Sequence, residues 1–523
     1  MIAGHLDLLM FATMCVVILA GFPVLFTLAG VGVLYAGLGY LLGVFEPQLA
    51  GAVPGRIFGT MTDQILLAIP LFVVMGVALE RSRIAEELLD CLVWLFGRLP
   101  GGLAISVSAV GALLAASTGI VGATIITLGL MALPTMLRHG YDHRFAAGSI
   151  AAAGTLGQII PPSTMLIILG VTMSAAYQQA QYAEGVFSIQ TLSIGQVFAG
   201  AMLPGLLLVG FYILYQLVTA RLRPHLAPVR AREDTLSGEP VTVRRLFRAL
   251  IAPLALIVAV LGSILGGIAT PSEAAAVGAV GGLILAALKS RRGTRLPLYA
   301  GLVAALALLV LTGLADLRVG RTTADTLARP VMWLALGLTA AMAGALALGL
   351  WRIQRDGILR QILDASVKIN AMIFAIIIAA SIFALVFRGV GGGERLRTLM
   401  EIMPGDQFGA LIFVMLLIFL LGFVLEFVEI TIIVIPIVGP VLMQMGFDPI
   451  WLSVLIAINL QTSFQTPPFG FSLFYLRGAA PPEVKTTEIY KGVLPFLVIQ
   501  IMTMLVLLAV PGLATWLPGV LFG

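Results

Sequence analysis

Apolar runs of about 20 residues recur along the whole chain, and no other feature constrains its fold as strongly. Of its 523 residues, 60% are hydrophobic and 11% are charged, and the mean hydropathy is +1.08. Inside a bilayer the backbone polar groups must bond within their own segment, so these runs predict transmembrane helices. The short alternating segments of a membrane β-barrel are absent from the sequence. We therefore expect an all-α polytopic membrane protein embedded in a lipid bilayer.

Charge and composition exclude several other classes of protein. The net charge is +5, but most arginines lie in a few loops, which is typical of membrane topology and not of nucleic-acid binding. Cys15 and Cys91 lie in separate elements and predict no disulfide framework. The four histidines lie at segment edges, so no metal cluster is expected. An intramembrane protease would need a Ser–His pair or paired aspartates at depth, and neither is present, so we expect no enzyme and no cofactor.

Two stretches of the chain repeat each other at a spacing of 306 residues. The stretch "LPTMLRHGYDHRF…GTLGQIIPPS" (133–163) aligns without a gap with "GPVLMQMGFDPIW…LQTSFQTPPF" (439–469). The shift places Asp142 on Asp448 and each proline of the first Pro-Pro pair on its counterpart in the second. An internal repeat of this kind predicts two structurally similar halves.

The distribution of basic residues predicts that the two halves are inverted. The apolar segment 103–137 has arginines at both ends, Arg98 and Arg138, so both ends are expected on the cytoplasmic side. The equivalent segment 406–443 lies within 398–476, which contains no Lys or Arg, so its ends are expected outside. Each segment is then a re-entrant hairpin, and both chain termini are expected outside.

Four stretches are expected to lose their helix inside the membrane. Two are hairpin tips, at 116–124 and 425–431, and two are broken spans, at 154–163 and 461–470. Proline removes a helical hydrogen bond, and the freed carbonyls must line a cavity or an ion. Oxygen ligands suit a hard cation such as Na⁺, and half-helix N-termini suit an anion. The alternative for each broken span is an ordinary proline kink, with Ser and Thr bonding back to the preceding turn.

Other polar motifs support two further predictions and one local structure. Glu426 and Glu429 lie in the second hairpin, where a carboxylate is costly and usually functional, although a watery tip is the alternative. In "TPSE", Glu273 matches a helix capping box, with a nearby substrate role as the alternative. The run "GVGGGER" (389–395) is expected to be a flexible loop and not a phosphate site, because no strand precedes it.

Several longer motifs resemble one transporter family. "GTLGQIIPPS", "GGIATPSEAAAVGA", "LPGLLL" and "TPPFGFSLFYLRGAAP…IYKGVLPF" resemble the large membrane subunit of tripartite ATP-independent periplasmic (TRAP) transporters, over nearly the whole chain. The resemblance implies an inverted-repeat, elevator-type transporter with two re-entrant hairpins and two broken helices. It implies Na⁺-coupled symport of an organic acid, such as a carboxylate or keto acid, across the bacterial inner membrane. The expected partners are a periplasmic substrate-binding protein and a separate small membrane subunit of about four helices.

The resemblance also implies particular site residues. Expected Na⁺ ligands are Ser117, Thr118, Thr155, Gly157, Glu426, Thr462, Ser463 and Thr466. Expected substrate contacts are Gln158, Pro161, Ser163, Gln461, Gln465 and Pro467. The chain departs from the family pattern at Ala123, where many members have Asp. It also has two additional apolar segments, at 297–315 and 330–350, which indicate a subgroup with two extra helices.

The expected division of the chain follows from the repeat. A mobile transport domain comprises 101–192 and 406–478, each with a hairpin and a broken helix. The remaining parts are 1–100 (scaffold and interfacial arm), 193–288 (connecting helices and cytoplasmic loop), 289–360 (the extra scaffold helices), 361–405 (second scaffold helix and arm) and 479–523 (C-terminal helix). The alternatives to this function are an organic-anion carrier that acts without a binding protein, and a membrane channel.

Overall fold

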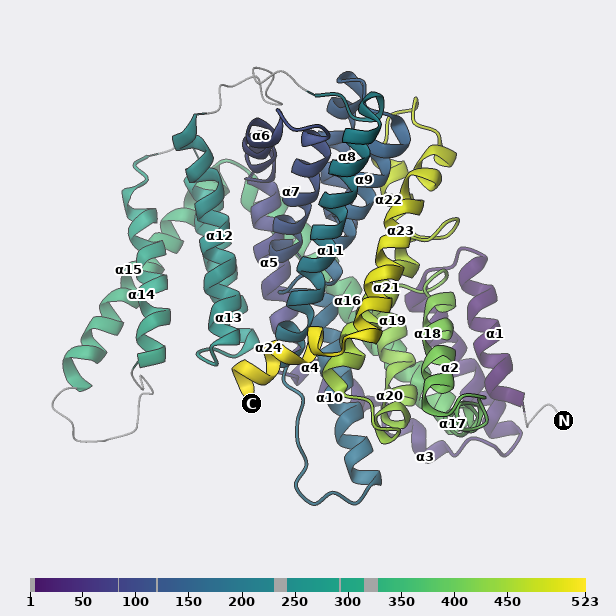
Figure 1. Ribbon diagram of the computed structural model, residues 1–523. Helices are drawn as coiled ribbons and strands as arrows, with labels where there is room; N and C mark the ends of the chain where they lie inside the picture. Colours follow the sequence, from purple (N-terminus) through teal and green to yellow (C-terminus); the bar gives the residue numbers. More distant parts are fainter. Residues whose placement is uncertain (1–4, 83, 119–120, 230–241, 291–292, 315–327) are drawn as a thin grey trace.

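The protein is all-helical over the part that its structure, a computed structural model, describes. That part comprises residues 5–82, 84–118, 121–229, 242–290, 293–314 and 328–523 (Figure 1). Within it, nine helices are long and apolar enough to cross a membrane, and one bent pair passes the same test. The predicted all-α polytopic membrane fold is confirmed.

The helices follow one another in two similar series. The first half contains α1 (Leu6–Leu19), α2 (Val24–Leu41), α3 (Pro47–Ala50), α4 (Val53–Thr62), α5 (Ala68–Arg81), α6 (Ile84–Phe96), α7 (Gly102–Thr118), α8 (Val121–Arg138), α9 (His143–Thr155), the 3-10 turn η2 (Leu156–Gln158), α10 (Thr164–Ala183) and α11 (Ile194–Leu222). The connection contains η3 (Pro224–Leu226), α12 (Val243–Leu265), α13 (Pro271–Leu288), α14 (Leu296–Leu314) and α15 (Ala328–Arg355). The second half contains α16 (Ile358–Gly389), α17 (Gly392–Glu401), α18 (Asp406–Leu421), α19 (Phe427–Ile433), α20 (Ile435–Gln444), α21 (Pro449–Gln465), α22 (Phe471–Ala479), α23 (Thr486–Ala509) and α24 (Gly512–Phe522).

Equivalent helices begin in the same way in the two halves. Asp142 caps α9 by accepting hydrogen bonds from the backbone N–H groups of Arg144 and Phe145. Asp448, at the position shifted by 306 residues, caps α21 by accepting from the N–H of Trp451 at 2.8 Å. A capping carboxylate satisfies N–H groups that no helical carbonyl can reach, so it fixes the first residue of each helix.

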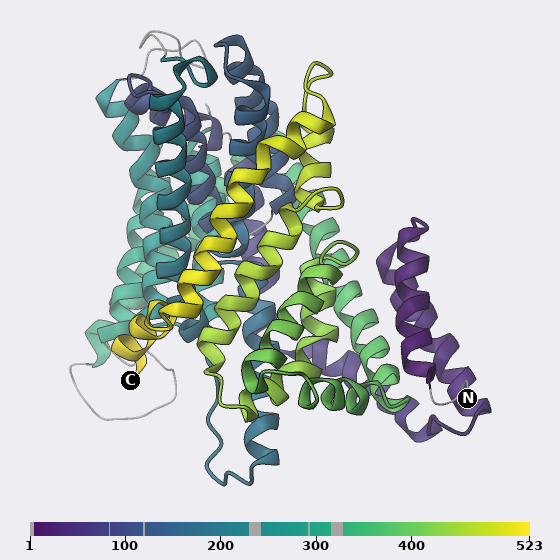
Figure 2. The same ribbon diagram turned by 45° about the vertical axis from the view of Figure 1, so that its right-hand side comes forward.

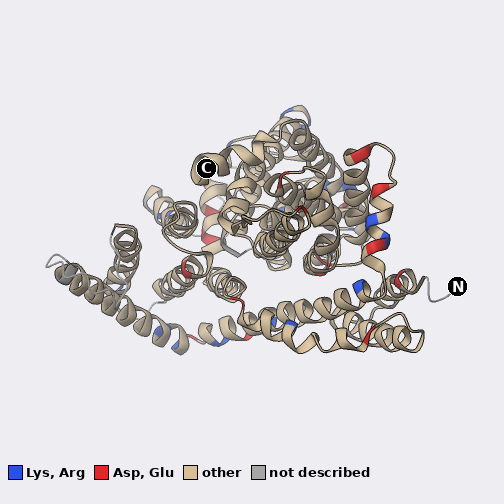
Figure 3. Cartoon of the chain, turned by 90° about the horizontal axis from the view of Figure 1, so that it is seen from below, with Lys and Arg blue, Asp and Glu red and all other residues tan. Residues whose placement is uncertain are grey.

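The two halves point in opposite directions, as predicted. The outer ends of α7 and α8 lie at the upper side of the molecule with α6, whereas those of α18 and α20 lie at the lower side with α17 (Figures 1 and 2). The helix α1 begins at the lower side, where α24 ends. Seen from below, charged residues gather on a few elements such as α17 and leave most of the helical body uncharged (Figure 3). By the positive-inside rule the upper side, with its basic loops, is cytoplasmic.

The helices expected in the scaffold pack on one another and also on the hairpin units, since α5 contacts α7 and α16 contacts α19. Helices α2 and α5 pack on α16, and α13 packs on α5 and α15. The hairpin helices α7 and α8 pack on α9, and α18 packs on α21. The pair α14 and α15 lies at the edge of the molecule, and α15 buries only 6% of its apolar window (Figure 1). Such exposed apolar helices fit a lipid-facing position.

The scaffold helices differ between the halves in one respect. The positions equivalent to α4, the break at 63–67 and α5 all fall within α16 when they are shifted by 306 residues. The second half therefore has one helix of 32 residues where the first half has two helices and a joint.

The helices α6 and α17, which precede the two hairpins, each form ion pairs with other helices. On α6, Glu87 pairs with Lys289, and Arg245 lies 3.8 Å from both Glu87 and Asp90. On α17, Arg395 Nε lies 2.5 Å from the nearly buried carboxylate of Asp7 at the start of α1. These pairs therefore join α6 to α12 and to the end of α13, and α17 to the start of α1.

Two local predictions have opposite outcomes. The capping box of Glu273 is confirmed, because its side chain accepts from the Thr270 N–H at 2.8 Å and its own N–H donates to the Thr270 hydroxyl. The prediction of a flexible loop at 389–395 is wrong, because α16 continues to Gly389 and α17 begins at Gly392. Gly391 has φ +92, a conformation that glycine adopts freely, so the glycines form a tight corner between two helices.

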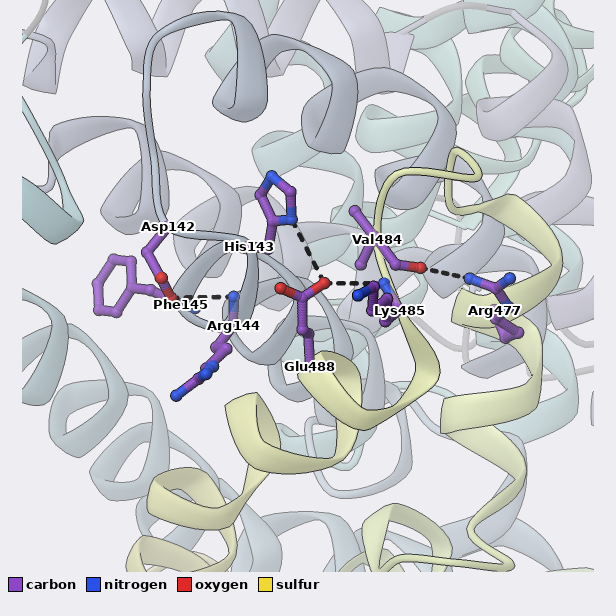
Figure 4. Close-up of polar contacts among 8 residues, drawn as sticks. All are labelled: Asp142, His143, Arg144, Phe145, Arg477, Val484, Lys485 and Glu488. Carbon is purple, nitrogen blue, oxygen red and sulfur yellow. Dashed lines mark hydrogen bonds and ion pairs between the residues drawn. The ribbon is translucent and has the colours of Figure 1, made fainter.

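Polar contacts connect the start of α9 with the segment that joins α22 to α23 (Figure 4). His143, at the start of α9, lies 3.3 Å from the carboxylate of Glu488 at the start of α23. Glu488 also accepts from the backbone N–H of Lys485, and Arg477 of α22 donates to the carbonyl of Val484. Parts of the chain more than 300 residues apart thus form one unit at this side.

Candidate functional site

The two broken spans meet at the centre of the repeat. The first break separates α9 from α10, and the second separates α21, which ends at Gln465, from α22, which begins at Phe471. The side-chain Nε2 of Gln461 donates to the hydroxyl of Thr155 at 3.3 Å. These residues are 306 positions apart, so they are the same position in the two copies. Two equivalent residues can contact each other only close to the axis that relates the copies, so the breaks form one central site.

Each hairpin lies unusually close to the broken helix of its own half. A Cβ on Gly154 of α9 would lie 2.2 Å from the Ile125 side chain of α8. A Cβ on Gly422, at the end of α18, would lie 2.0 Å from the hydroxyl of Ser463. Glycine has no Cβ, and such small residues allow membrane helices to approach each other closely. The hairpins are therefore held against the breaks by glycine contacts.

The hydroxyls of the breaks bond to their own helices. Each donates to a carbonyl three or four residues earlier, at 2.7–2.9 Å: Thr155, Thr462, Ser463 and Thr466. This back-bonding is the feature expected of the kinked-span alternative, but both helices end at the breaks and do not continue through them. A hydroxyl that donates its hydrogen retains its acceptor lone pairs, so these oxygens can still ligate a cation.

Three buried glutamines leave polar atoms without a hydrogen-bond partner. Gln158 is 1% exposed, and neither its Nε2 nor its Oε1 has a partner. Oε1 of Gln461 and Nε2 of Gln465 also lack a hydrogen-bond partner. An unsatisfied buried amide costs about 1–3 kcal/mol. These atoms are therefore free to bind a polar ligand.

Most of the other residues expected at the site lie in or beside one of the two breaks. Gly157 is buried in η2, and Ser163 donates to the carbonyl of Gln158 at 2.9 Å. Pro161 is buried and Pro467 is half-buried. The residues Ser117 and Thr118 end α7, but their side chains lie outside the described part of the structure.

The second hairpin carries two carboxylates, three residues apart in the chain. Glu426 directly precedes α19 and accepts from the hydroxyl of Tyr475 at 3.3 Å. Glu429 is fully buried, and neither of its oxygens has a hydrogen-bond partner. The position equivalent to Glu429 in the first half is Ala123, so carboxylate chemistry occurs at one hairpin only.

Sequence reasoning missed a polar pair behind the second break. The Nε2 of Gln500 in α23 donates to Oε1 of Gln465 at 2.7 Å and lies 2.8 Å from the hydroxyl of Tyr212 in α11. All three side chains are fully buried. A single glutamine in the apolar segment 490–512 was a usable signal, because a polar residue at membrane depth needs a partner.

A cavity of about 360 Å³ lies between the hairpins and the scaffold. Both hairpins line it, with Gly122 and Ala123 on one side and Glu426 on the other. The scaffold contributes α16 and the end of α5 with Glu80 and Arg81. We call this the inner cavity, because the end of α5 lies at the cytoplasmic side (Figure 1). It has room and charge for a small organic ligand.

Comparison with known families identifies the fold. The family described as "Tripartite ATP-independent periplasmic transporter, DctM component" matches residues 11–316 and 332–513. The chain belongs to this family. It is accordingly the large membrane component of a TRAP transporter in the bacterial inner membrane, and it is not an enzyme.

Several curated relatives are named transporters. The chain is 26% identical to the C4-dicarboxylate TRAP transporter large permease protein DctM of Vibrio cholerae, over 88% of this chain and 86% of that protein. It is 24% identical to the ectoine TRAP transporter large permease protein TeaC of Halomonas elongata, over 98% and 99%. It also resembles the crystal structure of the Alcanivorax borkumensis YdaH transporter, with a TM-score of 0.52, 17% identity and 98% coverage of both chains, which shows likeness of fold alone.

Proposed function

We propose that this TRAP subunit carries out Na⁺-coupled symport of an organic acid by an elevator movement of its two hairpin units. The contact between Gln461 and Thr155 is the single observation that carries the proposal, because it brings two mirrored breaks into one central site. Inverted repeats with broken helices at the membrane midplane are typical of secondary transporters. No metal or organic cofactor is needed beyond Na⁺ as the coupling ion.

Cation binding is assigned to the oxygens of the second half. The hydroxyls of Thr462, Ser463 and Thr466 and the carboxylate of Glu426 lie in the second break and at the second hairpin. Neutral oxygens with one carboxylate suit a monovalent hard cation. In the first half we assign the same role to Ser117, Thr118, Thr155 and Gly157, close to the axis.

Substrate binding is assigned to the buried amides and the half-helix ends. Gln158, Gln461 and Gln465 provide free polar atoms, and Ser163 precedes the N-terminus of α10. Pro161 and Pro467 complete the lining of the two breaks. The positive end of a helix dipole and several amide donors suit a carboxylate.

The substrate class follows from chemistry and from relatives. The named substrates of relatives include C4-dicarboxylates, isethionate, ectoine and sialic acid. All of them carry a carboxylate or sulfonate group, so we propose a small organic acid. The proposed partners are a periplasmic binding protein that delivers it and a small membrane subunit.

Reconstitution tests this proposal directly. The chain is placed in liposomes with a candidate small membrane subunit, a candidate binding protein is added outside, and uptake of radiolabelled organic acids is measured with and without an inward Na⁺ gradient. Uptake that requires both Na⁺ and the binding protein supports the proposal. Full uptake without the binding protein would establish the simpler carrier. Flux without counterflow exchange would establish a channel.

A further inference from the structure

A cavity of about 340 Å³ lies among α6, α12, α13 and α14, far from the two breaks in the chain. Its walls are mostly apolar, with Phe247 near the start of α12, Leu285 and Leu288 at the end of α13, and Tyr299 near the start of α14. Helix α12 begins at the upper, cytoplasmic side of the molecule, so the cavity lies at that side (Figure 1). We call it the lateral groove.

The lateral groove opens toward the lipid bilayer. Helices α12 and α14 both pack on α13, but among the described residues they have no extensive contact with each other. Three large side chains of its lining, Phe247, Ile251 and Tyr299, are 58%, 57% and 40% exposed. The three helices are each long and apolar enough to span a membrane, so these exposed faces suit the hydrocarbon region. An acyl chain can therefore enter between α12 and α14.

Positive charge gathers at the cytoplasmic end of the groove. Lys289 directly follows α13 and Arg295 directly precedes α14, and both line the groove. Lys289 forms an ion pair with Glu87 of α6. Arg295 is exposed, and none of the described carboxylates forms an ion pair with it.

A second arginine reaches the same turn from α15. Arg352 is 4% exposed, and its Nη2 donates to the carbonyl of Thr294, the residue before Arg295, at 2.8 Å. Its Nη1 is buried and has no hydrogen-bond partner, and no ion pair joins it to a described carboxylate. A buried guanidinium without an anion is energetically costly. This nitrogen is therefore available to an anionic group at the turn.

A phospholipid with an anionic headgroup matches both parts of this arrangement. Guanidinium groups bind phosphate through paired hydrogen bonds, and basic pockets between membrane helices at the cytoplasmic side suit anionic headgroups. Lys289, Arg295 and Arg352 supply three cations at this end, whereas Glu87 supplies one carboxylate. A soluble phosphate would leave the apolar walls of the groove uncovered.

We propose that the lateral groove is a binding site for an anionic phospholipid, whose acyl chain lies between α12 and α14 and whose phosphate is bound by Arg295 and Arg352. The bound lipid would connect α6, the helix before the first hairpin, with the pair α14 and α15. The site is separate from the central breaks, and it does not depend on the proposed transport of an organic acid.

Lipid titration of the purified full chain tests the proposal. The chain is stripped of lipid in detergent and titrated with dioleoyl phosphatidylglycerol, which is anionic, or dioleoyl phosphatidylcholine, which is zwitterionic, and bound lipid is counted by native mass spectrometry. We expect phosphatidylglycerol to bind about 25-fold more tightly, about five-fold for each of the two arginines that lack an ion pair.

Matched variants separate the headgroup contacts from the acyl contacts. Arg295→Gln should reduce the preference for phosphatidylglycerol about five-fold, and because Arg295 is exposed the fold should be unaffected. Arg138→Gln, which changes an exposed arginine at the cytoplasmic end of α8, should leave the preference unchanged. Ala252→Phe places a ring in the groove and should weaken binding of both lipids without changing their ratio.

Three results would overturn the inference. Equal affinity of the unmodified chain for the two lipids would exclude a site for an anionic headgroup. An unchanged preference in Arg295→Gln would place the headgroup elsewhere on the molecule. Competition by glycerol phosphate as strong as that by the whole lipid would show a site for soluble anions instead. None of these measurements involves transport, so they leave the liposome test of the proposed function unaffected.

Discussion

The two breaks share their geometry but differ in chemistry. The first break carries Gln158, a buried amide without partners, and its hairpin has Ala123. The second carries three back-bonded hydroxyls, its Gln465 is supported by Gln500, and its hairpin has Glu426 and Glu429. Symmetry therefore explains why both helices break at one place. It does not explain the acidic character of the site, which only the second half supplies.

The largest effect should come from the packing of the first broken helix. A Cβ on Gly148 of α9 would lie 2.0 Å from the backbone oxygen of Gly492 in α23. The equivalent residue, Val454, lies beside Gly200, and its side chain would be 3.4 Å from a Cβ built on that glycine. We expect Gly148→Ala to destabilise the folded protein by about 3 kcal/mol, because backbone atoms cannot yield as a side chain can. Thermal unfolding in detergent measures this, and Val454→Ala should cause a clearly smaller loss. Equal losses would contradict the difference in packing.

The second-largest effect should come from replacing the carboxylate of Glu426. Glu426→Gln removes the formal charge that we assign to the ion site, and a charge-assisted contact contributes about 1.5–3 kcal/mol. We expect the Na⁺ concentration for half-maximal uptake to rise at least about ten-fold. Tyr475→Phe, which removes only the hydrogen bond to Glu426, should raise it about three-fold. Unchanged Na⁺ dependence in Glu426→Gln would place this carboxylate outside the ion site.

The hydroxyls provide a more direct contrast between the halves. Ser463→Ala with Thr466→Val should raise the half-saturating Na⁺ concentration about five-fold, because two neutral oxygens are lost from the second break. Ser163→Ala, in the first break, should leave it within about two-fold, because we assign that hydroxyl to the substrate and not to Na⁺. If Ser163→Ala had the larger effect, Ser163 would have to be counted among the Na⁺ ligands.

The smallest expected effect concerns the amides. Gln158→Leu removes two unsatisfied polar atoms and should stabilise the ligand-free protein by about 1 kcal/mol while weakening substrate binding. Gln465→Leu should destabilise it by a similar amount, because Gln500 loses an acceptor. Paired melting curves and substrate titrations check both signs. Destabilisation by Gln158→Leu would show that its amide is already satisfied in the membrane.

The fold was predictable because its determinants are local and repeated. Apolar runs dictate spanning helices, and the shift of 306 residues places Asp142 and Asp448 at equivalent helix starts. The distribution of Lys and Arg was sufficient to predict the inversion. These properties can be read from a sequence because each depends on one segment at a time.

The contacts of the site were less predictable, because they depend on distant segments. No spacing rule connects Gln500 to Tyr212, which lies 288 residues away. The hydroxyls were recognised, but the direction in which they donate is decided by the local backbone. The prediction of a flexible loop at 389–395 failed for a similar reason. A positive φ at one glycine produces a sharp corner between two helices as readily as a flexible loop.

The unbroken helix α16 has a mechanical consequence. Its 32 residues, at about 1.5 Å each, form a rod about 48 Å long, whereas the hydrocarbon core is about 30 Å thick. The first turns carry Arg360 and Asp364, whose side chains are 88% and 64% exposed, so that end of the helix suits the polar headgroup region. The same rod lines the inner cavity and a second cavity, of about 280 Å³, beside Arg56 and Asp63. A change in bilayer thickness or headgroup charge that tilts α16 would therefore change the shape of both cavities together. Lipid composition would then affect transport through the tilt of this one helix.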